Sequence, residues 1–342
     1  MQKITPADML AQKSQLPLLD VRTPAEYERG HIPGAINFPL FSNEERVIIG
    51  TLYKKKGKNL AVEKGLELVG PKLAQFVKSA KKLAVNQEIM LHCWRGGMRS
   101  GSMAWLFETA GLRPKVLQGG YKAYRQLVHR DFSERKLPLK VLSGATGSGK
   151  TIILHEMAKQ GHQVIDLEKL ANHKGSSFGA IGEDPQPVTE HFENLLHQRI
   201  LELDPSRPVW IENESRGIGS VYIPQGFWEQ MQTAPLINIS IPQKNRLDIL
   251  TQIYTGEDPA LLQAAFERIK KKLGGQNLKK ALQALQEGDY HTAAEIALYY
   301  YDKAYAYGLE KNKSRSIEMI DFDYFEADKM AQVLTLAGQA EN

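Results

Sequence analysis

Residues 139–160, LKVLSGATGSGKTIILHEMAKQ, place a glycine-rich loop between a short apolar run and a segment whose apolar residues have helical spacing. Within this stretch, GATGSGKT matches the pattern GxxxxGK[ST] in full. Glycines in this pattern let backbone amides approach phosphate oxygens, the lysine neutralises them, and the last hydroxyl can ligate Mg²⁺. The sequence therefore predicts an α/β domain that binds a diphosphate group. The predicted binding residues are Gly144, Ala145, Thr146, Gly147, Ser148, Gly149, Lys150 and Thr151.

The rest of this domain is expected to supply strands at residues 163–166, 208–212 and 236–241 and a helix at 152–159. A nucleotide triphosphatase would also need an acidic residue at a strand end, and two segments compete for that position. VIDLE offers Asp166, whereas VWIENES offers Glu212 and Glu214; with Thr151, these three residues are the candidate metal ligands. No base-recognition motif such as NKxD is present, so the motif leaves the ligand open.

A polar segment at residues 166–187, rich in glycine, serine and histidine, is predicted to form a loop over the phosphate site. Side chains of such a loop can donate hydrogen bonds to an anionic substrate or attract it by their positive charge. Arg216 in ENESRGIG could reach the same phosphate site. The candidate residues in the loop itself are His173, Lys174, Ser176 and Ser177.

The only cysteine of the chain, Cys93, lies in LHCWRGGMRS at residues 91–100. An apolar strand is expected before it and a helix from near Ser100, so the loop amides between them can point towards the sulfur. This arrangement lowers a thiol pKa and binds an anion, and Arg95 and Arg99 add positive charge. Cys93, Arg95 and Arg99 are therefore the predicted catalytic residues.

The stretch LLDVRTPAEYERGHIPGAINFPL at residues 18–40 matches the first signature of the rhodanese family. Asp20, Arg22 and Glu26 in it are expected to form ion pairs that brace the site. The remaining matching residues are Gly30, His31, Gly34, Ala35 and Asn37. The pattern HCx5RS leaves two chemistries open. Some dual-specificity phosphatases resemble rhodaneses in fold and carry a loop of this length, so the loop length slightly favours a phosphatase. Against a phosphatase, no acidic residue in the loop can serve as the general acid that such hydrolysis needs. Sulfur or selenium transfer through cysteine is the other chemistry.

The bulk composition, with 342 residues, 42% hydrophobic and 24% charged, is that of an ordinary globular protein. No apolar run approaches the roughly 20 residues of a membrane span, and the N-terminal residues lack the apolar core of a signal peptide, so a cytoplasmic location is expected. One cysteine excludes an internal disulfide and a four-cysteine zinc site. The net charge of +5 favours contact with a polyanion.

Three regions are predicted: a rhodanese-like domain at residues 1–130, a P-loop α/β domain at 137–248 and a helical section at 249–342. The best linker candidate is the polar segment 129–138. The helical section is a candidate RNA surface because it carries several basic residues. They are Lys270, Lys271, Lys272, Lys279, Lys280, Lys311, Lys313 and Arg315.

The rhodanese loop, the phosphate-binding loop, DLEKLANHKGSSFG and ENESRGIG, in this order, resemble the bacterial tRNA 2-selenouridine synthase family. The resemblance implies a transferase that modifies wobble 2-thiouridine in tRNA. In that family, geranyl diphosphate first alkylates the sulfur, and selenium from selenophosphate then replaces the geranylthio group. The family's single essential cysteine corresponds to Cys93, and its Walker A motif corresponds to residues 144–151.

The resemblance further implies geranyl diphosphate at the phosphate-binding loop, without a need for ATP hydrolysis, and selenophosphate at Cys93. No tightly bound cofactor is expected, Mg²⁺ is an open candidate, and the basic helices would hold the anticodon arm of the tRNA. An apolar groove for the prenyl chain is also required, with Phe178, Phe227, Trp228 and Tyr222 as candidates. A cysteine phosphatase fused to a P-loop module and a nucleotide-switched RNA-binding adaptor are the alternatives.

Overall fold

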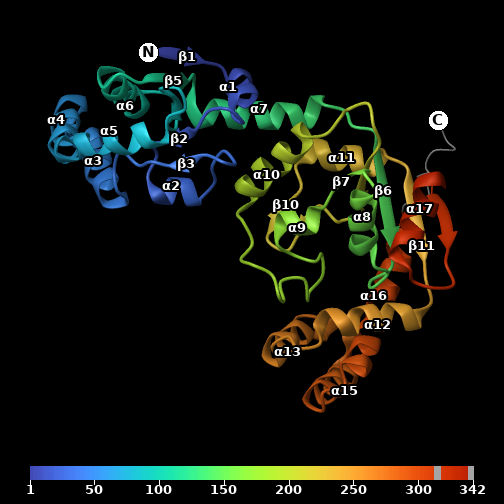
Figure 1. Cartoon of the computed structure of the whole chain (residues 1–342). Helices are drawn as coiled ribbons and strands as arrows, with labels where there is room; N and C mark the ends of the chain where they lie inside the picture. Colours follow the sequence, from blue (N-terminus) through green and yellow to red (C-terminus); the bar gives the residue numbers. More distant parts are fainter. Residues whose placement is uncertain (312–316, 338–342) are drawn as a thin grey trace. The chain divides into compact units, whose positions relative to one another are not determined.

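The computed structural model describes the backbone of residues 1–311 and 317–337 and the side chains of residues 1–307 and 317–337. The chain divides into two compact units (Figure 1). The first comprises Met1–Asp131 with Glu193–Leu195, and the second comprises Phe132–Phe192 with Leu196–Asn342. No helix in the described part of the chain is both long and apolar enough to cross a membrane.

The first unit is built on a parallel sheet with the strand order β1-β5-β4-β2-β3. Its strands are β1 (Gln2–Ile4), β2 (Leu18–Asp20), β3 (Ile36–Asn37), β4 (Glu88–His92) and β5 (Arg113–Leu117). Its helices are α1 (Pro6–Gln12), α2 (Pro24–Glu28), α3 (Asn43–Lys56), α4 (Lys58–Val69), the 3-10 helix η1 (Gly70–Lys72), α5 (Leu73–Leu83), α6 (Met98–Thr109) and α7 (Gly120–Glu134), whose last residues belong to the second unit.

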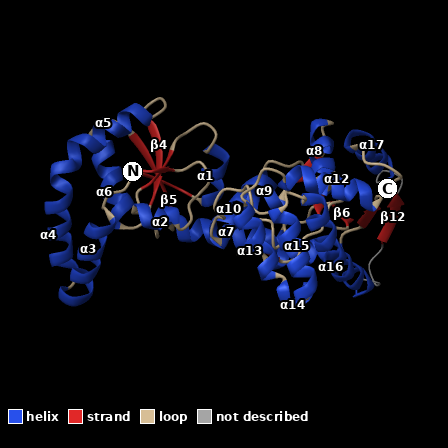
Figure 2. Ribbon diagram, turned by 90° about the horizontal axis from the view of Figure 1, so that it is seen from below, coloured by secondary structure: helices blue, strands red, loops and turns tan. Residues whose placement is uncertain are grey.

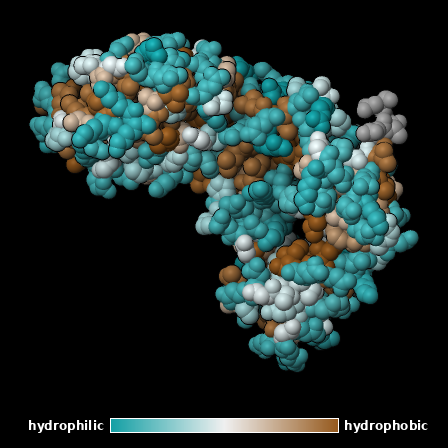
Figure 3. All heavy atoms as spheres, viewed as in Figure 1, coloured by the Kyte–Doolittle hydropathy of each residue, from teal (hydrophilic) through white to brown (hydrophobic). Residues whose placement is uncertain are grey.

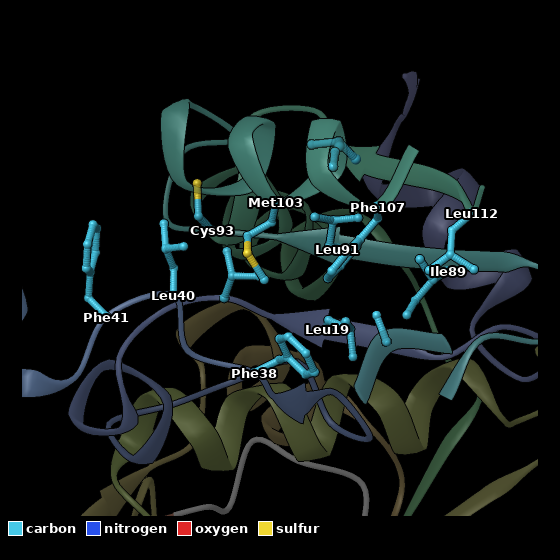
Figure 4. Packing of buried hydrophobic residues seen from close by; sticks show 14 residues of the cluster. Leu19, Phe38, Leu40, Phe41, Ile89, Leu91, Cys93, Met103, Phe107 and Leu112 are labelled. Atoms are coloured by element: carbon cyan, nitrogen blue, oxygen red, sulfur yellow. The ribbon is translucent and has the colours of Figure 1, made fainter. Parts of the chain in front are cut away.

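Helices cover both faces of this sheet, because the side chains of the central strand β4 alternate between the faces and are apolar on each. Ile89 and Leu91 pack in one cluster with Met103 and Phe107 of α6. Figure 2 shows α5 and α6 on one side of the strands and α1 on the other. Cys93, which follows β4 directly, lies at one end of the cluster near Leu40 and Met103 (Figure 4).

The second unit contains another parallel sheet, with the order β12-β11-β6-β8-β7. Its strands are β6 (Leu139–Gly144), β7 (Gln163–Ile165), β8 (Val209–Glu212), β11 (Leu236–Ser240) and β12 (Ile317–Asp321), and β9 (Gly217–Ile218) and β10 (Val221–Tyr222) form a separate pair. Its helices are α8 (Lys150–Lys159), α9 (Leu167–Ala171), α10 (Thr189–Leu201), α11 (Gln225–Thr233), α12 (Gln243–Tyr254), α13 (Pro259–Arg268), α14 (Lys270–Leu273), α15 (Gly275–Gln286), α16 (Tyr290–Lys311) and α17 (Ala327–Ala337). The predicted α/β fold class, with rhodanese-like and P-loop-like parts and helices near the C-terminus, is confirmed.

The boundary between the two units, after Asp131, lies within the predicted linker segment 129–138. Part of this segment is helical, because α7 continues to Glu134 and Phe132 packs against the rings of His197 and Phe227. The predicted helical section at 249–342 also contains a strand. Its strand β12 pairs in parallel with β11, and α17 packs on the sheet beside α8, where Met330 and Leu334 join the core cluster (Figure 1).

The helices α13, α15 and α16 form a cluster of their own. Its buried residues include Leu262 and Phe266 of α13, Leu285 of α15 and Ala297 of α16. Phe178, from the polar loop after α9, inserts into the same cluster, where its ring meets that of Phe266 edge-on at 4.9 Å between centroids. Part of the predicted loop is thereby fixed to the helical section.

Candidate functional site

Cys93 lies between the end of β4 and the start of α6, with only 3% of its surface exposed. Burial alone would raise the pKa of this thiol. Hydrogen bonds from the Ser100 hydroxyl and from the amides of Ser100 and Arg95, together with the charge of Arg99, outweigh it, so the pKa is lowered. The Sγ atom is 3.2 Å from Ser100 Oγ. The predicted reactive thiolate therefore has a physical basis in this loop.

The first turn of α7 fixes the loop that follows Cys93. The amides of Tyr121 and Lys122 donate to the carbonyls of Cys93 and Trp94, at 2.9 Å and 3.0 Å. Gly120, with φ of +62°, faces the loop so closely that a Cβ atom there would lie 2.8 Å from the amide nitrogen of Arg95 and closer still to Cys93 O and to the amide nitrogen of Gly96. This turn therefore holds the loop amides in place, and sequence reasoning overlooked it.

The two arginines predicted to be catalytic have different surroundings. Arg99 makes two hydrogen bonds to the carboxylate of Glu26, at 2.5 Å and 3.0 Å, and Glu26 also accepts from the amide of Thr23 at the start of α2. The positive charge of Arg99, which lowers the pKa of Cys93, is therefore held in a fixed position. Arg95 is exposed, so its side chain can meet an incoming anion.

The expected bracing role of Asp20 and Arg22 is confirmed. The two side chains are fully buried, and Arg22 Nη2 lies 2.6 Å from Asp20 Oδ2 and donates to the carbonyl of Gly30 at 2.8 Å. The guanidinium also stacks on the ring of Tyr121, 3.9 Å from its centroid. Buried charges are tolerated here because each is paired and hydrogen-bonded.

The phosphate-binding loop connects β6 to α8 in the second unit. Gly147 and Gly149 have φ of +79° and +74°, a conformation that favours glycine. Lys150 Nζ donates to the carbonyl of Gly144 at 2.9 Å, which keeps the ammonium beside the loop. The Ser148 hydroxyl is buried and has no hydrogen-bond partner among the described atoms. These features suit a phosphate-binding loop, and binding of a diphosphate here stays a prediction.

Acidic side chains gather beside this loop. Thr151 donates to Glu168 at 2.9 Å, and the amide of Glu168 donates to Glu212 at 2.9 Å. Glu212 ends β8, the strand that pairs directly with β6. Glu168 was not among the residues predicted from the sequence, because no motif marks it. Burial and the nearby carboxylates raise the pKa of Glu212. Burial, and to a lesser extent the charge of Glu168, raises the pKa of Glu214 to about 7.

Asp166, the competing acid, has a structural role. It caps α9 by accepting from the amide of Lys169 at 2.8 Å, and it pairs with His155 at 2.6 Å. Within the described residues, no three histidine, cysteine, aspartate or glutamate side chains are arranged to hold a metal ion by themselves. A site formed by Thr151, one carboxylate and phosphate oxygens stays a prediction.

The candidate residues of the polar loop are mostly engaged within the protein. Lys174 pairs with Glu183 at 2.8 Å and donates to a backbone carbonyl. His173 is buried, and this burial is the main reason why its pKa is lowered. The Ser176 hydroxyl accepts from the amide of Phe178, and the amide of Ser177 donates to Tyr301. Arg216 is exposed. Their contact with a substrate anion stays a prediction.

The basic residues of the helical section are exposed where the structure describes them. Lys270, Lys271 and Lys272 lie on α14, and Lys279 and Lys280 lie on α15. Lys311 ends α16 with a side chain outside the described part, and Lys313 and Arg315 lie outside the described residues. An RNA surface on α14 and α15 therefore stays a prediction with its charges accessible.

Comparisons with known proteins agree on both units. The rhodanese-like domain model matches residues 5–127, and the tRNA 2-selenouridine synthase AAA domain model matches residues 137–327. Curated tRNA 2-selenouridine synthases are similar over most of their length. That of Nitrosomonas europaea is 33% identical, covering 87% of this chain and 90% of its own. Those of Shewanella woodyi and Bdellovibrio bacteriovorus are 36% and 34% identical, covering 88% and 94% of this chain and 90% and 96% of their own. With both domain models in order and this similarity along nearly the whole chain, the protein belongs to the tRNA 2-selenouridine synthase family of enzymes.

Proposed function

We propose that this enzyme converts wobble 2-thiouridine of tRNA to 2-selenouridine in two steps. Geranyl diphosphate alkylates the sulfur first, and selenium from selenophosphate then replaces the geranylthio group. The observation that carries the proposal is that one chain combines a phosphate-binding loop with a cysteine whose pKa is lowered in an amide-lined loop. The proposal includes a cytoplasmic location, which a tRNA substrate supports.

The first step breaks a carbon–oxygen bond. The thiouridine sulfur attacks C1 of the geranyl group, diphosphate leaves with the bonding electrons, and the N3 proton of the base passes to solvent. The negative charge that develops on diphosphate is stabilised by the loop amides and by Lys150, whose ammonium already lies beside the loop. Because the leaving group departs intact, this step needs no hydrolysis of a nucleotide.

The second step exchanges sulfur for selenium at C2 of the base. The selenium of selenophosphate attacks C2, the carbon–sulfur bond breaks and geranylthiolate leaves. Water then cleaves the phosphorus–selenium bond, which releases phosphate and leaves selenium on the base. The loop around Cys93 supports this step because its amides and the exposed Arg95 can bind the phosphate-like end of the donor. Cys93 assists the delivery of selenium.

The proposal is tested by supplying the purified protein with thiolated tRNA and geranyl diphosphate, then with selenophosphate, and analysing the digested tRNA by mass spectrometry. We expect geranylated tRNA after the first incubation and selenated tRNA after the second. Lys150→Ala should weaken the first step, and Cys93→Ser should spare it but block the second. Unaltered thiouridine after both incubations with the wild-type protein would refute the proposal.

A further inference from the structure

We infer that the prenyl chain of the diphosphate substrate lies in an apolar cavity formed by α12, α13, α15 and α16, and that α16 sets the longest chain accepted. This inference rests on the proposed function, since it names where the substrate's hydrocarbon part binds. The cavity has an empty volume of about 510 Å³, which includes its open mouth.

The cavity begins at the phosphate-binding loop. Thr146 of the loop forms part of its wall, and so does Leu250 of α12. Leu250 packs against the loop as well, because a Cβ atom on Gly147 would lie 3.0 Å from its side chain. A diphosphate held by the loop therefore has an apolar wall directly beside it.

The chemistry of the lining suits a hydrocarbon better than a nucleotide base. Apart from Thr146 and Ser176, the lining residues have aliphatic or aromatic side chains, and the polar side-chain groups among them are hydroxyls. One of these, Tyr301 Oη, already accepts from the amide of Ser177 at 3.3 Å. A nucleotide base would find only hydroxyl side chains to pair with its several ring nitrogens and exocyclic groups there. An isoprenoid chain needs no partner and gains from leaving water.

The aromatic residues expected at a prenyl groove divide clearly. Phe178 lines the cavity. Phe227 is a core residue with 1% of its surface exposed, and neither Trp228 nor Tyr222 lines the cavity. Figure 3, drawn from the same side as Figure 1, shows a hydrophobic area where Figure 1 places α12 and α16. The three residues other than Phe178 are thus not part of the inferred site.

The course of α16 indicates the direction in which the prenyl chain runs from the phosphate-binding loop. Near its C-terminal part, Tyr305 Oη lies 3.0 Å from the hydroxyl of Ser143, the residue before the phosphate-binding loop. Tyr301 is one turn earlier and lines the cavity, and the helix then runs away from the loop towards Tyr290, which lines it too. The cavity therefore extends from the diphosphate along α16.

Small side chains on α16 leave the room for the substrate. Ala293, Ala294 and Ala297 all line the cavity. Ala294 precedes Tyr301 by seven residues, which is about 10 Å along a helix rising about 1.5 Å per residue. The eight-carbon main chain of a geranyl group is about 9 Å long when extended, with carbon–carbon bonds of about 1.5 Å. The end of a ten-carbon prenyl chain thus reaches the level of Ala293 and Ala294.

Ala294→Phe is the informative substitution, because Ala294 is only half-buried and a larger side chain there would fill the far part of the cavity. Ala304→Phe is the matched control, since Ala304 is exposed on the same helix and outside the cavity. Binding of geranyl diphosphate, of the five-carbon dimethylallyl diphosphate and of inorganic diphosphate is measured by calorimetry without tRNA. Transfer of both prenyl groups to thiolated tRNA is measured by mass spectrometry.

We expect Ala294→Phe to weaken geranyl diphosphate binding by about tenfold or more, as for other steric changes in hydrophobic pockets. Dimethylallyl diphosphate and inorganic diphosphate should bind as before, which also shows that the variant is folded. Tyr290→Ala, which opens the far end, should improve the use of the fifteen-carbon farnesyl diphosphate relative to geranyl diphosphate. Ala304→Phe should change none of these values.

Equal affinities of wild-type and Ala294→Phe protein for geranyl diphosphate, or an equal loss for all three ligands, would overturn the inference. So would a Tyr290→Ala protein with an unaltered preference between ten and fifteen carbons. Failure of the proposed function looks different. In that case the wild-type protein transfers no prenyl group to tRNA, whatever its binding preferences are.

Discussion

Replacement of Gly120 by alanine should damage the Cys93 loop far more than the fold around it. Two costs add at this position. The backbone has φ of +62°, where a residue with a Cβ atom pays about 1 to 2 kcal/mol. The new methyl group would also meet Cys93 O and the amide nitrogens of Arg95 and Gly96, and such overpacking typically costs about 1 to 3 kcal/mol. Together, the free energy of unfolding should fall by about 2 to 5 kcal/mol.

Gly111→Ala separates the two costs. Gly111 lies in the same unit with φ of +88°, and a Cβ atom there would meet nothing within 4 Å. This variant should lose only the backbone part, about 1 to 2 kcal/mol. The difference between the two variants therefore measures the contact of Gly120 with the loop.

Urea denaturation gives the free energies of unfolding, and the rate of Cys93 alkylation by iodoacetamide as a function of pH reports the loop. In Gly120→Ala, the amides that stabilise the thiolate are displaced, so alkylation should shift to higher pH, whereas Gly111→Ala should keep the wild-type profile. The reasoning would be refuted if both glycine variants lost the same stability and kept the same alkylation profile.

Further predictions concern the groups around the thiolate and the phosphate-binding loop. Ser100→Ala removes a hydrogen bond that lowers the pKa of Cys93, so alkylation at neutral pH should slow severalfold; an unchanged rate would contradict this role. Glu26→Gln breaks the ion pair with Arg99. Burial raises the pKa of Glu26, but the hydrogen bonds and charge of Arg99 outweigh this effect and lower the pKa below its usual 4.5. Glu26 therefore stabilises the fold above about pH 4.5 and loses this effect as the pH falls through its lowered pKa. The variant should unfold about 1 kcal/mol more easily at pH 7 and show a shrinking difference in acid, by urea denaturation; a constant difference from pH 7 to pH 3 would count against it. Glu168→Gln should change how strongly Mg²⁺ affects diphosphate binding, measured by calorimetry with and without the ion, and an identical Mg²⁺ effect in both proteins would exclude Glu168 from a metal site.

The elements that sequence predicted well are those whose signal is local. The strand, glycine-rich loop and helix around residues 139–160 are specified by neighbouring residues, and the same holds for the loop after β4. In both cases the motif fixes backbone shape and donors together, so their residues could be named in advance.

What sequence missed depends on partners that are distant along the chain. Glu168 meets Thr151 only because α9 turns back towards the phosphate-binding loop, and no spacing rule marks this approach. The strand β12 is half-exposed, and only its pairing with β11 makes it part of the sheet. The course of α7 through a polar segment depends similarly on Phe132, the one aromatic residue there that is buried. Tertiary contacts override weak local signals in each case.

The neighbours of a phosphate-binding loop decide which bond of the ligand is broken. In nucleotide hydrolysis, a phosphorus–oxygen bond breaks, so the protein must position a water molecule at the terminal phosphate and recognise a base. In the reaction proposed here, a carbon–oxygen bond breaks, and the loop and Lys150 have only to stabilise departing diphosphate. The nucleophile must then approach from the hydrocarbon side, where Thr146 and Leu250 border an apolar cavity. Exclusion of water from that side favours alkylation of sulfur over hydrolysis of the allylic diphosphate, because water would compete for the same carbon. In the proposed reaction, the apolar cavity serves the chemistry as well as the binding of the prenyl chain. A variant that admits water to it should lose geranylated tRNA while still releasing diphosphate.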